Sequence, residues 1–185
     1  MFILRKIFSF FIDTAQTLLL FASFFVFIYI FFFRPFQVNG DSMFPNFHDK
    51  EYILTDLISL RFDELKKGDV IVFRYPLDEE KDFIKRIIAV AGDTILLKDN
   101  NIYINNEKLD QHMYLNSDVK TYPSSFLKEG IPLSVPENMY FVMGDNRPYS
   151  SDSREWGFVK KNEVIGRSLF AYWPLDRIRR ITNPY

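Results

Sequence analysis

Cysteine is absent from this chain of 185 residues, and histidine occurs only at His48 and His112. Without cysteine there is no thiol nucleophile, no zinc–thiolate site and no disulfide framework, and the redox compartment is left open. The two histidines are far apart in the sequence and have polar neighbours, which favours solvated positions for both. A catalytic Ser-His-Asp arrangement therefore has no support in the sequence.

An excess of charge of one sign is also missing, because the formal net charge is −1. A chain without a basic excess has no bulk electrostatic attraction to nucleic acid. We therefore expect no nucleic-acid partner.

Phenylalanine is abundant but unevenly placed, since more than half of the 21 phenylalanines precede residue 37. Residues 17–33 carry no charge and would cover about 25 Å as a helix, so with the preceding residues they make a full membrane span. Arg5 and Lys6 also suit the start of a cleavable signal peptide. The apolar run is long, however, and it ends without a small-x-small cleavage site.

These features favour an uncleaved anchor at residues 15–33, after a short cytoplasmic segment at residues 1–14. Arg5, Lys6 and the amino terminus outweigh Arg34, which places the N-terminus inside and residues 34–185 outside the cell membrane. The segment formed by residues 34–185 is long enough for one domain with its own core.

Short runs of β-branched and aromatic residues dominate the segment after the anchor, and they predict a mostly β fold with an antiparallel catalytic core. The expected strands are residues 52–55, 70–73, 83–90, 94–97, 102–104, 139–143 and 164–173. Residues 99–101 suit a hairpin turn. A small inserted β-rich or irregular subdomain is expected at about residues 99–136, where residues 110–136 are polar and irregular. The basic run at residues 177–180 is expected to be a solvated tail.

Ser42 lies shortly after the anchor, with Gly40 before it and Pro45 after it. These neighbours predict a turn that presents the hydroxyl at the surface. A serine hydroxyl needs a base within hydrogen-bond reach to act as a nucleophile. On this segment alone, an ordinary turn serine is the simpler interpretation.

Lys85 is the candidate base, because it lies with Arg86 inside an apolar strand. Alternation along a strand turns one of these side chains toward the core. A lysine that faces inward loses hydration, which lowers its pKa and suits it to general-base chemistry. The alternative is that both cations project from an edge strand and hinder aggregation.

A third polar segment, residues 144–154, contains serines, aspartates and arginines in close alternation. Ser150 suits a hydrogen bond to the lysine amine. Asp152 and Arg154 are two residues apart, as are Asp145 and Arg147, and this spacing favours charge pairs that brace a loop. A solvated polar turn is the alternative.

Together these segments resemble the bacterial type I signal peptidases, which are membrane-anchored serine proteases that remove signal peptides from exported proteins. The resemblance covers most of the chain outside residues 110–136. The matching segments are Ser42-Met43-Phe44-Pro45, Gly68-Asp69-Val70-Ile71, residues 85–93 and residues 144–157.

The resemblance implies that Ser42 is the nucleophile, that Lys85 is the general base and that Ser150 orients the lysine. It further implies a structural ion pair between Asp152 and Arg154. A second pair is implied between Asp145 and Arg86.

Two positions differ among members of this family. Gly40 stands where some members have a serine that helps to bind the oxyanion, so the oxyanion hole is expected to rest on the Ser42 N–H, with Gly40 helping through its backbone geometry. Asn46 stands where threonine is commoner, and this change is expected to affect local capping more than chemistry.

The implied reaction passes through an acyl-enzyme and needs no metal or organic cofactor. The implied substrates are secretory preproteins with small residues at the first and third positions before the cut. Membrane phospholipids are further expected partners, through apolar residues such as Phe36, Met43 and Phe44.

Two other classes of function remain open at the level of the sequence. A different Ser–Lys protease, such as a pilus-processing peptidase or a self-cleaving repressor-type domain, would use the same pair of residues, although the anchor argues against a cytoplasmic repressor. A non-catalytic, membrane-anchored β domain that binds partners or lipids would explain the anchor and the strands but not the three matching motifs.

Overall fold

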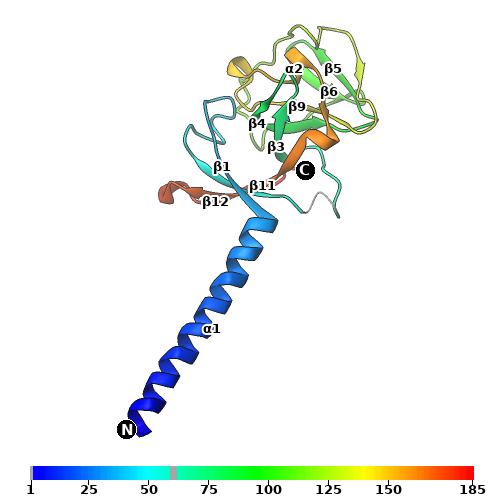
Figure 1. The fold of residues 1–185 in the computed structure, drawn as a ribbon. Coiled ribbons are helices and arrows are strands. Elements are labelled where there is room, and N and C mark those ends of the chain that lie inside the picture. The colour runs from blue at the N-terminus through cyan, green and yellow to red at the C-terminus, as the bar shows by residue number, and fades with distance from the viewer. Residues whose placement is uncertain (1, 59–61) are drawn as a thin grey trace.

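The computed structural model describes residues 2–58 and 62–185. One long helix, α1 (Phe2–Phe32), extends away from a body of antiparallel strands (Figure 1). Its segment Leu4–Phe27 is long and apolar enough to cross a membrane, and it is not buried against the rest of the protein. The hydroxyls of Thr14 and Thr17 donate to main-chain carbonyls one turn earlier, so these polar groups are satisfied within the helix.

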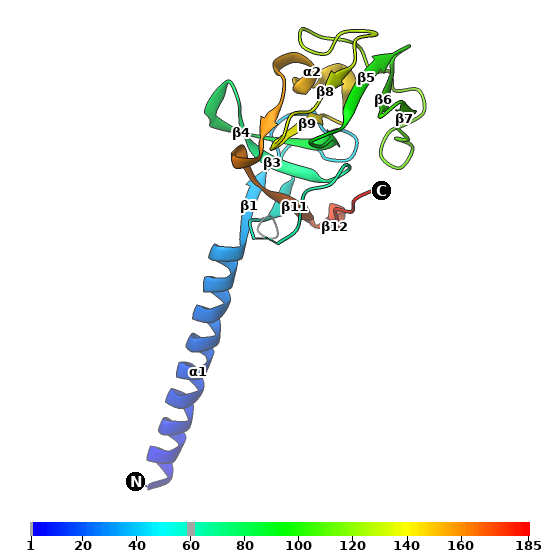
Figure 2. The same cartoon turned by 90° about the vertical axis from the view of Figure 1, so that its right-hand side faces the viewer.

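The larger sheet has eight strands, and its paired strands are antiparallel. The chain enters it directly from α1 (Figure 2). In spatial order its strands are β1 (Phe33–Gln37), β2 (Tyr52–Asp56), β11 (Val164–Trp173), β3 (Val70–Tyr75), β4 (Asp78–Ala89), β9 (Met139–Met143) and β10 (Val159–Lys160), with β12 (Arg179–Arg180) paired to β11.

A smaller sheet of four strands has the order β7 (Glu107–Lys108), β6 (Asn101–Ile104), β5 (Thr94–Lys98) and β8 (Leu133–Ser134). Strands β5 and β6 form a hairpin through Asp99 and Asn100, which both have positive φ angles. Asparagine and aspartate tolerate this conformation better than most residues. The short helices are η2 (Arg147–Tyr149), α2 (Ser153–Trp156), η3 (Lys161–Glu163) and η4 (Leu175–Arg177).

The two sheets share a hydrophobic core. Buried Ile95, Leu97 and Ile102 of the smaller sheet pack in one cluster with Ile88 and Phe141 of the larger sheet. Because burial of this apolar surface depends on both sheets, the smaller sheet is held firmly against the strand that carries Lys85.

The fold class predicted from the sequence is confirmed: the body is mostly antiparallel β, with an apolar helix before it. Strand β1 was not predicted, because its residues continue the aromatic run of α1 and include Pro35. Proline is tolerated there since β1 lies at the edge of the sheet and, among the described strands, pairs with β2 alone.

The prediction of a solvated basic tail at residues 177–180 is wrong for Arg179. Its guanidinium forms an ion pair with Glu51, at 2.7 Å between Nη2 and Oε2, and the Glu51 side chain is fully buried. Burial of a carboxylate requires a partner of opposite charge, and strand β12 supplies it.

Candidate active site

Ser42 lies in a compact turn, residues 41–47, that follows β1. The N–H of Phe44 donates to the carbonyl of Asp41 at 3.1 Å, and the N–H of Phe47 donates to the carbonyl of Met43 at 3.0 Å. Met43 and Phe47 are buried in a cluster under the turn. Their burial fixes the turn and leaves Ser42 at its surface-facing side, only partly buried.

Lys85 is buried in β4, with 3% of its surface exposed. Its Nζ lies 2.7 Å from Ser42 Oγ and 3.0 Å from the carbonyl oxygen of Ile84. Strand β9 pairs with β4 from Arg86 onward, so no described strand covers the side of β4 beside Lys85, which faces Ser42. The structure thus brings together the two residues that the sequence predicts to react.

Burial lowers the pKa of the Lys85 ammonium to about 8, because the charged form loses its hydration. Asp152 and Asp145 oppose this effect, since their negative charges raise the pKa, and Arg154 reinforces it. A lysine with this pKa is neutral in a substantial fraction of molecules near neutral to mildly alkaline pH.

Arg86, the neighbour of Lys85, forms a buried bidentate ion pair with Asp145. Its Nε lies 2.9 Å from Oδ1, and its Nη2 lies 2.7 Å from Oδ2. The guanidinium also donates to the carbonyl of Gly68 at 2.9 Å, and its Cζ lies 4.3 Å from the centre of the Tyr114 ring. These contacts satisfy both charges, which makes their burial tolerable.

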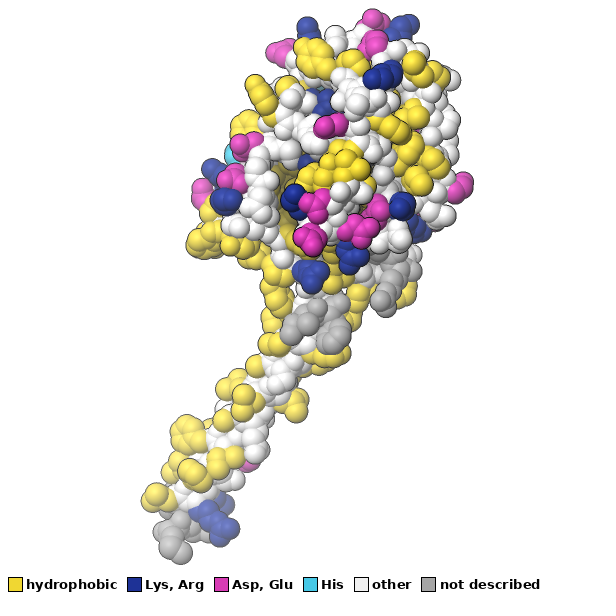
Figure 3. Space-filling view, turned by 45° about the horizontal axis from the view of Figure 1, so that its top comes forward, with side chains coloured by type: hydrophobic (Ala, Val, Ile, Leu, Met, Phe, Trp, Pro, Cys, Tyr) yellow, Lys and Arg dark blue, Asp and Glu magenta, His cyan; other side chains and the backbone are white. Residues whose placement is uncertain are grey.

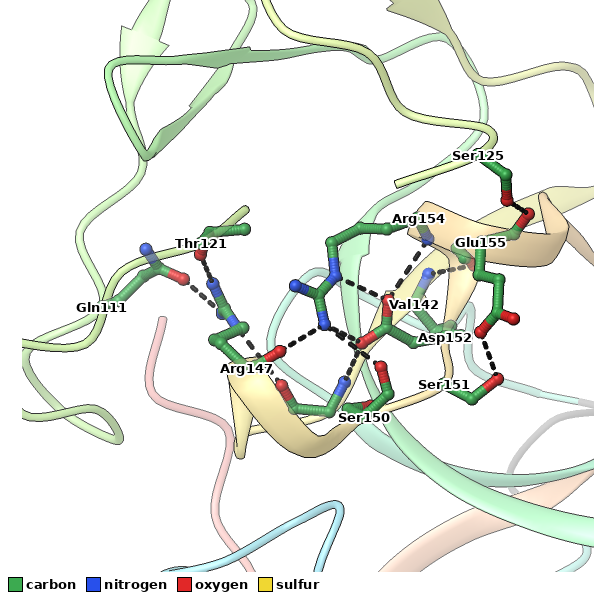
Figure 4. A network of polar contacts seen from close by, with 12 residues as sticks. Gln111, Thr121, Ser125, Val142, Arg147, Ser150, Ser151, Asp152, Arg154 and Glu155 are labelled. Carbon is green, nitrogen blue, oxygen red and sulfur yellow. Dashed lines mark hydrogen bonds and ion pairs between the residues drawn. The ribbon is translucent and has the colours of Figure 1, made fainter. Parts of the chain in front are cut away.

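Asp152 and Arg154 form a second buried pair, at 2.8 Å between Nε and Oδ1 (Figure 4). Asp152 also accepts the N–H of Gly144 at 3.0 Å, and Arg154 donates to the carbonyl of Arg147 at 2.7 Å. The pair therefore braces the whole loop that carries Ser150.

Ser150 does not make the hydrogen bond to Lys85 that the sequence predicts. Its Oγ is buried and has no hydrogen-bond partner among the described residues. Ser150 instead packs closely on Gly144, where an added Cβ would lie 2.2 Å from Ser150 Oγ. Since the loop on both sides of Ser150 is fixed by ion pairs, its hydroxyl is held at the site with unused hydrogen-bonding capacity.

Gly40 has a φ of +84°, which favours glycine, and its N–H donates to Asp49 Oδ1 at 2.7 Å. This N–H is therefore engaged, and Gly40 contributes its backbone conformation rather than a free donor. Within the described residues the Ser42 N–H has no acceptor, so it is available to a developing oxyanion.

Arg147 was expected from its spacing to brace the loop through Asp145, and this pairing does not form. Its side chain is 1% exposed and instead donates to Gly144 O, Thr121 Oγ1 and Gln111 Oε1. In Figure 4 it reaches from the Ser150 loop to the irregular segment that bears Gln111 and Thr121. Loss of hydration lowers the pKa of Arg147.

Asn146 is a site residue that the sequence analysis did not single out. Its N–H donates to the carbonyl of Ser42 at 3.0 Å, and its Nδ2 donates to the carbonyl of Asp41 at 2.9 Å. Its place in the polar segment at residues 144–154 was the available signal. The two bonds attach that segment directly to the Ser42 turn.

An open groove of about 520 Å³ leads to Ser42 and Lys85. Residues 35–39 line one side and residues 81–85 line the other, with Ile53 and Val72 also in its wall. Figure 3 shows charged side chains gathered near the middle of one face of the molecule, next to hydrophobic side chains. The volume of the groove and its mixed polar and apolar lining are typical of ligand-binding sites.

The described residues hold no cluster of three or more His, Asp or Glu side chains arranged to bind a metal ion. The chemistry of the site is that of a hydroxyl beside a desolvated amine, and this pair is suited to acyl transfer.

The chain matches the family described as signal peptidase, peptidase S26, over residues 11–173. It is 34% identical to signal peptidase I S of Bacillus subtilis (strain 168) over 154 residues, which are 81% of this chain and 82% of the relative. It is 32% identical to signal peptidase IB of Staphylococcus aureus (strain Mu50) over 165 residues, which are 83% and 85% of the two chains.

Among solved structures, the chain is similar to a crystal structure of a signal peptidase I from Enterococcus faecalis V583. The sequence identity is 31% and the TM-score is 0.46, over 57% of this chain and 97% of the other. With the family match over most of its length, this chain belongs to the signal peptidase family, peptidase S26, and is a serine endopeptidase.

Proposed function

We propose that this protein cleaves signal peptides from secretory preproteins with Ser42 as nucleophile and Lys85 as general base. The observation that carries the proposal is the distance of 2.7 Å between Lys85 Nζ and Ser42 Oγ at the end of an open groove. Membership of the signal peptidase family supports the cleavage of signal peptides by a serine protease.

In the reactive state Lys85 is neutral, and its lone pair accepts the hydrogen bond from the Ser42 hydroxyl. Ser42 Oγ attacks the scissile carbonyl carbon as its proton passes to Lys85 Nζ. Lys85 then protonates the leaving amine, and the acyl group stays on Ser42. Lys85 next removes a proton from water, which attacks the acyl-enzyme carbonyl. The acyl–Oγ bond breaks, Lys85 returns the proton to Ser42 Oγ, and the signal peptide is released with a free carboxylate.

The Ser42 N–H stabilises the oxyanion that forms in both tetrahedral intermediates. It has no acceptor among the described residues, and the Ser42 carbonyl is held by the Asn146 N–H at 3.0 Å. A donor fixed before the reaction needs no reorganisation when charge develops.

The substrate binds as an extended strand in the groove between β1 and β4. On its side away from β3, β4 pairs with β9 only from Arg86 onward, so its earlier part has an open edge among the described strands. Main-chain groups at such an edge can bind a peptide strand. The apolar wall at Ile53, Val72 and Ile84 then receives small side chains.

The pairing order makes β1 and β4 run in the same direction, so the groove leads from the α1 end of β1 toward Ser42. A signal peptide whose apolar part is in the bilayer enters from this membrane end. The anchor thus places the catalytic domain where the cleavage site emerges. In this topology the N-terminus is cytoplasmic, as Arg5 and Lys6 favour.

We also propose that the domain contacts membrane phospholipids, but through a set of residues that differs in part from the set expected from the sequence. Met43 is 0% exposed, so it packs in the core and does not face lipid. Phe44 is 45% exposed, and Trp173 and Leu175 are 51% and 68% exposed. These exposed side chains are suited to the interfacial region of a bilayer.

The test incubates the full-length protein, in detergent with phospholipid, with a preprotein that has a small-x-small cleavage site. The parent is expected to cleave at that site, and Ser42→Ala and Lys85→Ala are expected to be folded and inactive. Ser117→Ala and Lys98→Ala change exposed residues away from the groove and serve as matched controls. Cleavage that survives Lys85→Ala would reject Lys85 as the base.

A further inference from the structure

The side chain of Asn46 joins two segments that the sequence keeps far apart. Its Nδ2 donates to Asp145 Oδ2 at 2.8 Å and to the main-chain carbonyl of Tyr114 at 2.7 Å. The first bond spans 99 residues of sequence and the second spans 68. The expectation that Asn46 affects mainly local capping is therefore wrong, because its amide makes long-range contacts.

Asp145 connects Asn46 to the strand of the proposed base. The same Oδ2 atom that accepts the Asn46 amide also accepts Arg86 Nη2 at 2.7 Å. Arg86 directly follows Lys85 in β4 and is 4% exposed. Any displacement of Asp145 is thus transmitted to the backbone beside Lys85.

At the other end, Asn46 belongs to the turn that carries Ser42. The turn is closed by the Phe47 N–H bond to Met43, and both residues are buried. The carbonyl of Asn46 accepts the guanidinium of Arg179, which is itself paired with the buried Glu51. The main chain of Asn46 is therefore fixed as well as its side chain.

We propose that Asn46 is a positioning residue that sets the distance between Ser42 Oγ and Lys85 Nζ. It does so by tying the Ser42 turn, residues 41–47, to the ion pair between Asp145 and Arg86. The inference rests on the proposed roles of Ser42 and Lys85. A neutral amide is suited to this place because both of its N–H groups are donors, and a second carboxylate would repel Asp145.

The expected effect is on the reaction rather than on substrate binding. Asn46 is absent from the residues that line the groove, so its loss leaves the groove wall intact. A small misplacement of reacting atoms costs up to about 100-fold in rate. Asn46→Ala is therefore expected to lower kcat about 10- to 100-fold with KM changed by no more than about twofold.

Two further variants separate positioning from packing. Asn46→Asp keeps the size but places a carboxylate against Asp145, and we expect kcat below that of Asn46→Ala. Asn46→Thr keeps one hydroxyl donor for either acceptor, and we expect kcat between those of Asn46→Ala and the parent. The exposed Asn162→Ala serves as a control that leaves kcat unchanged.

The comparison also needs a variant that only weakens the fold. Ile102→Ala opens the core shared by the two sheets from strand β6 of the smaller sheet. It is expected to lower the melting temperature and to leave kcat per folded molecule unchanged at temperatures where it is folded. All variants are assayed on one preprotein, with the folded fraction measured by circular dichroism.

The predicted result is a fall in kcat at constant KM for Asn46→Ala, a larger fall for Asn46→Asp and partial rescue by Asn46→Thr. A kcat of Asn46→Ala within twofold of the parent, or a fall fully explained by the folded fraction, would overturn the inference while the proposed function stood. A parent that cleaves nothing would overturn both.

Discussion

Lys85 Nζ and Ser42 Oγ are 2.7 Å apart, although 43 residues separate them in the chain. Several attachments of the Ser42 turn support this contact. Beside the hydrogen bonds of the Asn46 side chain, they include the buried packing of Met43 and Phe47 and the two hydrogen bonds from Asn146 to Asp41 and Ser42. A hydroxyl and an amine held in this way, by packing and by hydrogen bonds to the main chain, are in place before a substrate binds.

The two adjacent serines of the polar loop give a matched pair of variants. Ser150 Oγ is buried without a partner, whereas Ser151 Oγ donates to the exposed Glu155 at 2.7 Å. If Ser150 orients Lys85 during the reaction, Ser150→Ala lowers kcat by at least about tenfold, as expected for disturbed general-base catalysis. Ser151→Ala keeps the parent rate. Steady-state kinetics on one preprotein measures kcat for the two variants. Equal kcat values would show that Ser150 has no part in the mechanism.

Lys85 is expected to reduce the stability of the folded protein below pH 8. Its pKa falls from 10.5 to about 8 on burial, so the folded state binds fewer protons than the unfolded state between these values. The free energy of unfolding therefore rises with pH across this window, by up to about 3 kcal/mol in total.

Lys85→Met removes this titration and keeps the aliphatic volume. It is predicted to raise the unfolding midpoint at pH 7 and to flatten the rise between pH 8 and pH 10.5. Urea denaturation of the protein in detergent, repeated across this pH range, measures the midpoint and its pH dependence. The exposed Lys98→Met variant is the control. An unchanged pH slope in Lys85→Met would mean that Lys85 is not desolvated.

The ion pair between Arg86 and Asp145 predicts that substitutions of these two residues have strongly non-additive effects on the free energy of unfolding. Arg86→Met leaves the fully buried Asp145 carboxylate without its main partner, and we expect a loss of about 3–5 kcal/mol of unfolding free energy. The double variant Arg86→Met/Asp145→Leu removes both charges and is expected to be more stable than Arg86→Met alone. A double variant as unstable as the sum of the two single variants would argue against direct pairing.

Gly144 lies where an alanine would press on the reactive turn. An added Cβ would be 2.4 Å from the carbonyl oxygen of Ser42 and 2.2 Å from Ser150 Oγ. The first contact involves main chain and cannot be relieved by a side-chain rotation. We therefore expect Gly144→Ala to lower kcat by at least about tenfold through displacement of Ser42.

Gly130→Ala is the control for this substitution. Gly130 has a φ of +72° and open space around it, so alanine there introduces backbone strain in a turn beside strand β5 without a clash near Ser42. It is expected to lower stability and to leave kcat unchanged. Equal kcat values for the two variants would show that Gly144 does not control the position of Ser42.

Much of the β body could be predicted from local pattern, since strands such as residues 70–73 and 139–143 are short apolar runs bounded by turn residues. Strand β1 could not, because its aromatic residues follow the membrane helix without a break. The two-residue strands β7, β8, β10 and β12 carry too few residues for any periodicity to appear.

The supporting contacts of the site were harder to predict than Ser42 and Lys85. Arg147 is 36 residues from Gln111 and 26 from Thr121, and Asn46 is 99 residues from Asp145. Such contacts depend on how irregular segments pack on one another, and this packing leaves no periodic signal in the sequence. The spacing of the motif suggested Asp145 as a local partner for Arg147. In the structure the buried guanidinium instead donates to the neutral side chains of Thr121 and Gln111, in a distant segment.

The most direct test of the central claim is the pH dependence of kcat/KM for the parent on a soluble peptide substrate. If neutral Lys85 is the base, the value rises with pH, since only the deprotonated amine can accept the Ser42 proton, with a midpoint near the Lys85 pKa of about 8. It then levels off above that pH. A profile that is flat between pH 6.5 and pH 9.5, or that falls across this range, would contradict the account.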